Sequence, residues 1–256
     1  MTTTPPSPPA AIDWTHYGAV LFDLDGVITP TAEIHERAWA ALFADFGYAD
    51  GDYHAHIDGK PRAAGVRDFL AAKGIELPEG TDDDPPDAET LNGLGNRKNA
   101  VFNEILDAGG IEAYPGSMRL LDHLEGLGIE SAVVSSSKNA RRVLAAAGLS
   151  DRFEVIVDGL VAAEESLPGK PHPDTFWFAA QQLGVETARC VVIEDALSGV
   201  GAGRDGGFAL VIGVDRADQA EALRQAGADI VVADLSETLD DPDPGDTAPP
   251  GGDRLR

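Results

Sequence analysis

Short apolar segments alternate with longer amphipathic ones along most of this chain, and this alternation constrains its fold more than any other feature. Six apolar segments have the length and composition of buried β-strands: 18–23, 129–134, 153–157, 190–194, 208–213 and 229–232. Helical patterns occupy five intervals, several of which end at a glycine: 117–127, 138–147, 173–183, 196–205 and 216–226. Alternating strands and helices predict an α/β fold with a doubly wound parallel sheet.

One long interval interrupts this alternation. Between residues 31 and 113 no segment has the pattern of a strand, whereas helical patterns cover 32–46, 63–72 and 87–107. Roughly eighty residues are far more than a connecting loop needs. We therefore predict an all-helical domain, residues 31–113, inserted above the strand ends of a core domain that comprises 14–30 and 114–235.

The two ends of the chain have compositions that disfavour packing. Residues 1–13 are rich in Thr, Pro and Ala, and residues 236–256 are rich in Asp, Pro and Gly. Such segments carry too little apolar surface to offset the entropy lost on folding. We expect a disordered N-terminal tail and a flexible acidic C-terminal tail.

The net charge limits the partners of the chain. Its 256 residues include 44 Asp and Glu against 19 Lys and Arg, which gives a formal net charge of −25 at pH 7. Nucleic acids and anionic membranes repel an acidic surface, so neither is expected as a partner. An anionic substrate then needs a local basic pocket or a divalent cation. The sequence has no recognisable leader and no apolar stretch long enough to span a membrane, and we expect a cytoplasmic monomer.

Two carboxylates, Asp23 and Asp25, follow the apolar segment 19–22 in the sequence Asp-Leu-Asp-Gly-Val. Residues two apart in a strand project to the same side, and open α/β sheets bind ligands at the carboxyl ends of their strands. One carboxylate can then attack or bind a metal while the other moves a proton. The spacing disfavours a calcium loop, because Gly26 stands fourth and Ile34 replaces the final Glu. A polar strand end that turns into a loop is the alternative for this motif alone.

Three further polar segments fall at predicted strand ends. Ser135–Asn139 offers hydroxyls, an amide and an ammonium before a helix, which suits an anion. Lys170 lies in the segment Gly169-Lys170-Pro171-His172-Pro173-Asp174, whose prolines fix the backbone around the lysine. Glu194 and Asp195 offer the oxygen ligands that Mg²⁺ takes. Singly, each segment is also explained as a turn, a loop lysine or a helix cap. Together they favour phosphoryl transfer with an aspartyl nucleophile.

These four segments resemble the four motifs of the haloacid dehalogenase superfamily, over a core that runs from about residue 17 to 232. Within it, further matches are similar to the β-phosphoglucomutase family: Thr31-Ala32-Glu33-x-His35-x-Arg37-Ala38-Trp39, Arg97-Lys98-Asn99, Tyr114-Pro115-Gly116 and Ser135-x-Ser137-Lys138-Asn139. The resemblance implies a Rossmann-like core with an inserted helical cap. Pro30, His172 and the extra cap length around 50–56 and 80–87 depart from the family pattern.

The resemblance implies a role for each matched core residue. Asp23 would be the nucleophile that forms an aspartyl phosphate, and Asp25 would be the general acid and base. Mg²⁺ would be the cofactor, held by Asp23, Glu194, Asp195 and the backbone carbonyl of Asp25. Ser135 and Lys170 would hold the transferring phosphoryl group and stabilise its charge.

The resemblance also implies how a phosphorylated sugar, the expected small-molecule partner, is bound. Its other phosphate would contact four residues: Arg62, Ser137, Lys138 and Asn139. Lys98 would contact sugar hydroxyls, and His35 would interact with Asp25 once the cap has closed. Trp39 is explained either by packing in the first cap helix or by contact with the sugar. A closing cap would keep water away from the aspartyl phosphate.

These roles favour an isomerase that uses Mg²⁺ to convert β-D-glucose 1-phosphate to glucose 6-phosphate through β-glucose 1,6-bisphosphate. The alternative is a sugar-phosphate phosphatase, in which the same core uses water as the final acceptor. His35 and Lys98 argue against it. A non-catalytic binding protein is disfavoured by the intact set of four motifs.

Three other patterns have simpler explanations than a site. Cys190 is the only cysteine, so it forms no internal disulfide, and we interpret it as a buried residue. Gly201–Gly206 satisfies the dinucleotide fingerprint, but a helix-like stretch rather than a strand precedes it. Polar residues, among them two histidines, alternate with apolar ones over 52–58, which we interpret as a solvated polar face opposite an apolar one rather than a metal site.

Overall fold

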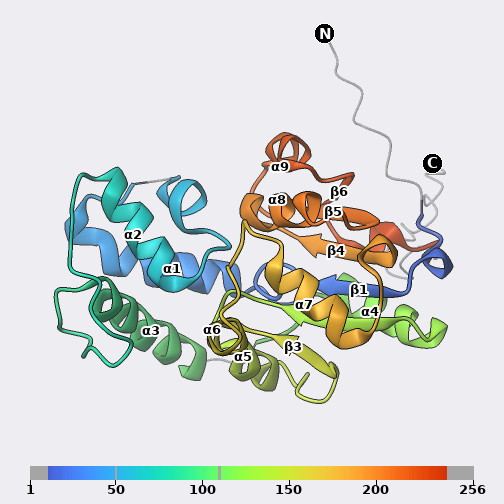
Figure 1. The fold of residues 1–256 in the computed structure, drawn as a ribbon, viewed down its shortest axis with the longest axis horizontal. Coiled ribbons are helices and arrows are strands. Elements are labelled where there is room, and N and C mark those ends of the chain that lie inside the picture. The colour runs from blue at the N-terminus through green and yellow to red at the C-terminus, as the bar shows by residue number, and fades with distance from the viewer. Residues whose placement is uncertain (1–10, 50, 109–110, 241–256) are drawn as a thin grey trace, which may run out of the picture.

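The computed structural model describes residues 11–49, 51–108 and 111–240. The chain forms an α/β core and a helical cap that lies beyond the carboxyl ends of the core strands (Figure 1). Six parallel strands form one sheet in the order β3-β2-β1-β4-β5-β6. They are β1 (Ala19–Phe22), β2 (Glu130–Val134), β3 (Val155–Val157), β4 (Cys190–Glu194), β5 (Leu210–Val214) and β6 (Ile230–Val232). Each lies within two residues of its predicted bounds, so the predicted parallel α/β fold is confirmed.

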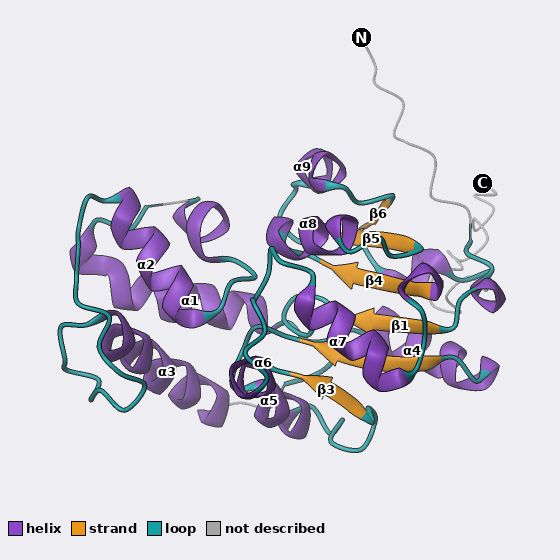
Figure 2. Cartoon of the chain, viewed as in Figure 1, coloured by secondary structure: helices purple, strands orange, loops and turns teal. Residues whose placement is uncertain are grey.

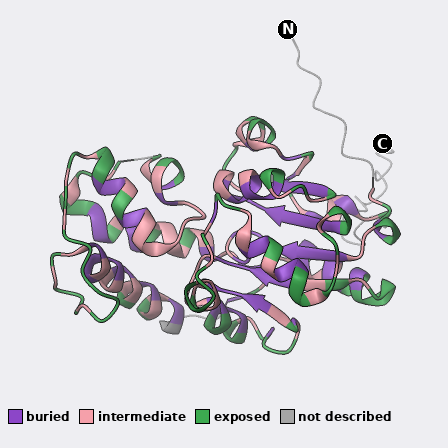
Figure 3. Ribbon diagram, viewed as in Figure 1, coloured by how far each residue is buried: buried purple, intermediate pink, exposed green. Residues whose placement is uncertain are grey.

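Helices cover both faces of this sheet (Figure 2). The core helices are α4 (Pro115–Leu127), α5 (Ala140–Ala146), α6 (Gly159–Glu164), α7 (Asp174–Leu183), α8 (Leu197–Asp205) and α9 (Ala220–Ala226), with 3₁₀ turns at Trp14–His16, Thr187–Arg189 and Leu235–Thr238. Val20 and Phe22 pack with α4 and α5, whereas Ala19 and Leu21 pack with α7 and α8. Alternate residues of β1 are thus buried on opposite faces, and the whole strand is buried (Figure 3), which explains the unbroken apolar run.

The sheet order creates a switch point between β1 and β4. The chain continues from β1 to β2 on one side, and β4 pairs with β1 on the other. Phe22 is in register with Ile193, and the Asp23 amide donates to the Ile193 carbonyl at 2.9 Å. Asp23 and Glu194 therefore leave neighbouring strands at the same height, where ligands bind in open α/β sheets.

All regular elements in the described residues of the cap are helical. It consists of α1 (Thr31–Phe43), α2 (Arg62–Ala72) and α3 (Leu91–Ala108), with a 3₁₀ turn at Ala44–Phe46 and a π-helical turn at Tyr53–Ile57. These elements enclose an apolar core of their own, in which Phe43 stacks on Phe69 with ring centroids 3.9 Å apart. No described helix is long and apolar enough to cross a membrane.

The folded core extends further at both ends than the sequence predicted. The Ile12 amide donates to the Thr238 carbonyl at 3.0 Å, and the buried Trp14 indole donates to the same oxygen at 3.3 Å. A capping box formed by Asp234 and Glu237 fixes the last 3₁₀ turn. Residues 11–13 and 236–240, which we expected in the tails, are therefore ordered. The rest of both tails lies outside the described residues.

Candidate active site

Three carboxylates meet where β1 and β4 end. Asp23, Glu194 and Asp195 are buried, and one oxygen from each lies within 4.8 Å of the others. Lys170 lies among them: its Nζ is 2.5 Å from Asp23 Oδ1 and 2.6 Å from Glu194 Oε1, and it donates to the Val134 carbonyl at 2.9 Å. Among the described residues this is the only group of acids close enough to share a metal ion.

Two glycines leave room for these carboxylates. Gly26 has φ +85°, and a Cβ there would lie 1.8 Å from Asp195 Oδ2. A Cβ at Gly199 in α8 would lie 1.7 Å from Glu194 Oε1. Any side chain at either position would displace an acid of the cluster, so the arrangement of the carboxylates requires glycine at both positions.

The cluster carries more negative charge than Lys170 neutralises. Burial raises the pKa of Asp23 well above its usual range, and the charges of Glu194 and Asp25 add to this rise, whereas Lys170 opposes it. Burial likewise raises the pKa of Asp195. Three buried oxygen donors with uncompensated charge fit a divalent cation that prefers oxygen ligands, such as Mg²⁺.

Asp25 has a different environment, which comes from the cap. The Thr31 hydroxyl donates to Asp25 Oδ1, and His35 Nε2 lies 3.4 Å from the same oxygen. Burial alone would raise the pKa of Asp25, but the charge and hydrogen bond of His35, together with Thr31 and Lys98, lower it to about 2. Asp25 is therefore ionised in this state.

Lys98 and His35 form a short chain of polar contacts that ends at Asp25. The Lys98 amine contacts His35 Nδ1, and His35 Nε2 faces Asp25. Burial lowers the pKa of His35, and burial together with the charge of Arg62 lowers the pKa of Lys98 to about 7. The predicted approach of His35 to Asp25 is thus present in the structure.

A cavity lies between cap and core at this point. Most of the predicted site residues line it: Asp23, Asp25, His35, Trp39, Arg62, Lys98, Ser137, Lys138, Asn139, Glu194 and Asp195. Trp39 also stacks on Phe43 in the cap core, so it serves packing and borders the cavity.

Lys170 and Ser135 lie behind this cavity wall and are both buried. Lys170 reaches the site through its contacts with Asp23 and Glu194. The Ser135 hydroxyl accepts from the Ser137 amide at 3.1 Å, and Ser135 borders an adjoining cavity instead. Ser135 therefore belongs to the same loop as the predicted site but does not line the cavity that contains Asp23.

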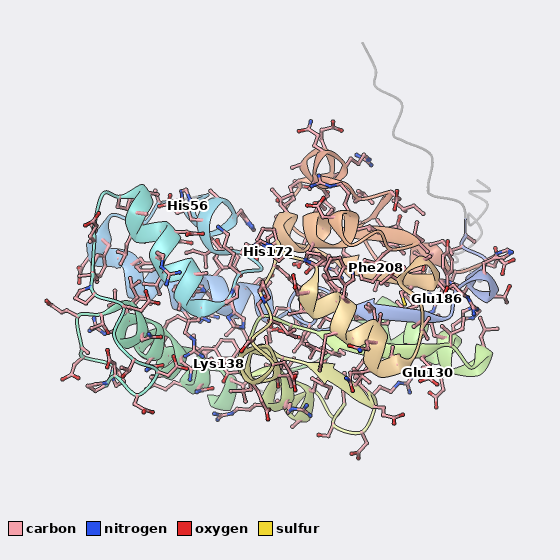
Figure 4. The ribbon with its side chains drawn as sticks, in the orientation of Figure 1. His56, Glu130, Lys138, His172, Glu186 and Phe208 are labelled. Atoms are coloured by element: carbon pink, nitrogen blue, oxygen red, sulfur yellow. The ribbon has the colours of Figure 1, made fainter. Side chains whose placement is uncertain are left out.

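The cap is closed against the core. The Ser136 hydroxyl donates to the Gly59 carbonyl at 2.7 Å, and the Ser198 hydroxyl donates to the Asp58 carbonyl at 3.0 Å. Lys138, which lies between the two domains in Figure 4, pairs with Asp82 of the cap at 2.7 Å. The long cap loop around 80–87, a departure from the family pattern, thus reaches the core.

Arg62 of the cap and Asn139 of the core meet at the same residue, Asn99. Arg62 donates to Asn96 Oδ1 at 3.2 Å and to Asn99 Oδ1 at 3.0 Å, and Asn139 Nδ2 donates to Asn99 Oδ1 at 2.6 Å. With Lys138 they line the cavity and give it two cationic side chains. Burial lowers the pKa of Arg62, but the ordinary pKa of an arginine lies far above neutral, so Arg62 stays charged.

Sequence reasoning missed the part of the cavity wall formed by Tyr53, Ile57 and Asp58. Alternation over 52–58 suggested one polar and one apolar face, but the segment is a π-turn in which the Asp58 amide donates to the Tyr53 carbonyl at 2.9 Å. Tyr53 and Ile57 are buried, as the predicted apolar face requires, but Ala55 is exposed, so that face is confirmed only in part. His54 is exposed and pairs with Asp58.

Two other interpretations are confirmed. Cys190 is buried, and burial raises the pKa of its thiol to about 11, which leaves no reactive thiolate at neutral pH. The glycines at 201–206 belong to α8 and its end rather than to a nucleotide loop. A Cβ at Gly203 would lie 3.1–3.3 Å from Val192 and Val211, so this glycine lets the helix approach the sheet.

The sequence and the fold are similar to known proteins. The sequence model of the haloacid dehalogenase-like hydrolases matches residues 17–207. A β-phosphoglucomutase from Mycobacterium tuberculosis is 48% identical over 238 residues, which cover 86% of this chain and 91% of that protein. One from Bacillus subtilis is 35% identical over 86% of this chain and 90% of its own length. The crystal structure of a β-phosphoglucomutase from Clostridium difficile superimposes with a TM-score of 0.71 at 30% identity, covering 86% of this chain and 92% of that one.

Proposed function

This chain belongs to the haloacid dehalogenase-like hydrolase family, and from this membership and its site we propose that it is a β-phosphoglucomutase. It interconverts β-D-glucose 1-phosphate and glucose 6-phosphate through β-glucose 1,6-bisphosphate. The relatives support this proposal by their similarity over most of the chain. The carrying observation is that one cavity is lined both by Asp23, the proposed nucleophile, and by the cations Arg62 and Lys138. Such a cavity suits a sugar with a phosphate at each end.

In the proposed mechanism Asp23 carries the phosphoryl group between two sugar hydroxyls. The sugar hydroxyl attacks phosphorus of the Asp23 aspartyl phosphate and gives its proton to Asp25, which frees the carboxylate of Asp23. The bisphosphate then turns end for end, and Asp23 attacks its other phosphorus while Asp25 returns the proton to the leaving oxygen. Lys170 stabilises charge on the transferred group from behind Asp23.

The pKa values of the two aspartates fit only the first of these steps. Asp25, with its pKa lowered to about 2, is ready to accept a proton, and contact with His35 keeps it so. Its return as an acid requires that the Lys98–His35 chain shift away from it. The raised pKa of Asp23 must fall before it attacks, which requires more positive charge than Lys170 supplies. Sugar binding and a divalent cation are the proposed sources of these two changes.

Mg²⁺ would be held by Asp23, Glu194, Asp195 and the backbone carbonyl of Asp25. When bound it would neutralise charge between the acids and the phosphate. The closed cap would exclude water, and Arg62, Lys138 and Asn139 would orient the phosphate that is not transferred.

Phosphorus NMR of the purified protein tests the proposal. With β-glucose 1-phosphate, Mg²⁺ and a trace of β-glucose 1,6-bisphosphate, we expect the glucose 6-phosphate signal to grow at the rate at which substrate disappears. Inorganic phosphate should remain a minor product. Stoichiometric inorganic phosphate with no dependence on bisphosphate would instead identify a sugar-phosphate phosphatase.

His35→Ala should lower the mutase rate by about 10²-fold and raise the share of phosphate lost to water. The reason is that His35 joins Lys98 to Asp25 and so couples cap closure to the proton carrier. The ratio of inorganic phosphate to glucose 6-phosphate measures this coupling. His123→Ala, which removes an exposed histidine of α4, is the matched control and should leave both products unchanged. An unchanged ratio in His35→Ala would refute this role.

Metal removal should abolish turnover, with a loss of at least about 10²-fold that Mg²⁺ restores. A second readout is independent of activity: Mg²⁺ at about one hundred times its Kd should stabilise the folded protein by about 2.7 kcal/mol in chemical denaturation. Asp195→Asn removes one proposed ligand and should lose most of this stabilisation. If Mg²⁺ stabilises the variant as much as the parent protein, the acidic cluster is not its site.

A further inference from the structure

The cap contributes one carboxylate to the cavity that has no role in the mechanism above. Asp58 lines the cavity together with Asp25 and Asp195, and its side chain is 13% exposed. We propose that Asp58 accepts a hydrogen bond from a ring hydroxyl of the sugar and thereby selects among sugar phosphates. This inference rests on the proposed function and assigns a specificity-determining residue to it.

The backbone holds Asp58 at the line where cap and core touch. Its carbonyl accepts from the Ser198 hydroxyl of α8 at 3.0 Å, and its amide donates to the Tyr53 carbonyl at 2.9 Å. The following Gly59 has φ +70°, and a Cβ there would lie 2.3 Å from the Ser198 hydroxyl oxygen. A residue fixed from both domains presents its side chain in one orientation whenever the cap is closed.

The side chain of Asp58 is itself positioned by the π-turn. His54 Nδ1 lies 3.0 Å from Asp58 Oδ2. Burial and then the charge of Asp58 raise the pKa of Tyr53, whose buried ring also lines the cavity. A carboxylate offers about four acceptor positions, so these neighbours orient Asp58 and leave it acceptor capacity for a ligand.

The charge of Asp58 indicates which part of the substrate it meets. A carboxylate repels phosphate unless a cation lies between them, so without such a cation Asp58 suits the sugar rather than a phosphate. It is also not one of the three acids whose oxygens lie within 4.8 Å of one another, which argues against a metal ligand. Between two phosphates the sugar offers hydroxyl groups, and a hydroxyl donates a strong, charge-assisted hydrogen bond to a carboxylate. A substrate without that hydroxyl leaves the Asp58 carboxylate unpaired in a closed site.

Deoxy analogues of β-glucose 1-phosphate that lack the 2-, 3- or 4-hydroxyl test this inference. For one of them, kcat/KM of the parent protein should fall by about 10²-fold relative to glucose 1-phosphate. In Asp58→Ala the same pair of substrates should differ by only a few-fold, because the partner of that hydroxyl is gone. The isosteric Asp58→Asn keeps the shape of the residue, covers the case in which the alanine variant does not fold, and should show an intermediate ratio. Asp45→Ala, at an exposed acid of the cap, should keep every ratio of the parent protein.

The outcomes separate this inference from the proposed function. If Asp58→Ala loses activity equally on all four substrates, Asp58 is only structural and the inference is wrong. If the variant needs more Mg²⁺ while its substrate ratios stay those of the parent, Asp58 binds a cation, which also overturns it. The proposed mutase is tested separately by the product formed from glucose 1-phosphate in the parent protein. The ratios of kcat/KM between substrates can be measured whether the protein forms a sugar phosphate or inorganic phosphate.

Discussion

Asp23→Asn should lower turnover by about 10⁴-fold or more, because the amide that replaces the carboxylate cannot accept the phosphoryl group. The fold should persist, since the variant keeps the buried ion pair between Lys170 and Glu194. Intact-mass measurement after acid quenching gives a direct readout. The parent protein exposed to glucose 1,6-bisphosphate should gain the mass of one phosphoryl group, and the variant should gain none.

A matched control separates the loss of the nucleophile from the loss of an acidic residue. Asp122 lies on α4 and pairs at the surface with Arg152 at 2.7 Å. Asp122→Asn should keep full turnover and the phosphorylated species, because such exposed pairs contribute little. An Asp23→Asn protein that retains appreciable turnover, or still becomes phosphorylated, would exclude covalent catalysis by this residue.

Lys170→Met should reduce turnover by about 10²-fold to 10³-fold and also destabilise the fold. The ammonium is buried between Asp23 and Glu194, so its removal leaves these carboxylates without their cation. Loss of one partner from a buried ion pair costs about 3–5 kcal/mol. Chemical denaturation at neutral pH without divalent cations measures this loss, and turnover with saturating Mg²⁺ measures the catalytic effect.

The pH and Mg²⁺ dependence of this variant distinguish a charge effect from poor packing. The pKa of Asp23 is raised in the folded state. Between the ordinary pKa of an aspartate and this raised value, the folded protein holds a proton on Asp23 that the unfolded chain has released, so falling pH favours the folded state. The stability lost in Lys170→Met should therefore shrink as pH falls toward that ordinary value, and should also shrink when Mg²⁺ is added. Lys73→Met is the control, because Lys73 pairs with Asp52 in the cap, away from the site, and should cost about 1 kcal/mol or less. A loss in Lys170→Met that is independent of both pH and Mg²⁺ would point to packing alone.

The sequence alone was enough to predict the core sheet and its acidic cluster, because parallel strands bring their carboxyl ends to the same edge of a sheet. Acidic residues after two buried apolar runs must meet if those runs are neighbours in register, and Asp23 and Glu194 do so. Lys170 was harder, since it lies on a loop with no strand of its own. Its residue type and its prolines suggested a site, but only the fold brings its ammonium to both carboxylates.

The cap was less predictable because its spacing is irregular. A π-turn adds about one residue per turn, so the alternation around Asp58 indicated the faces only in part and concealed a residue of the cavity wall. The contact of Asp82 with Lys138 joins a cap loop of unusual length to the core, and no local pattern encodes such a pairing. The order of the pKa values of Asp23 and Asp25 depends on burial and on cap contacts, which a sequence does not display.

The position of β1 at the centre of the sheet has a consequence for how the chain is made. During synthesis β1 leaves the ribosome first, but its partners begin only at residues 130 and 190. The helical cap, which lies between β1 and β2 in the sequence, can pack on itself early, since its contacts are closer along the chain than those of β1. The nascent strand that carries Asp23 therefore waits, apolar and unpaired, until most of the polypeptide exists, and this interval is when the chain is most exposed to aggregation or to capture by chaperones.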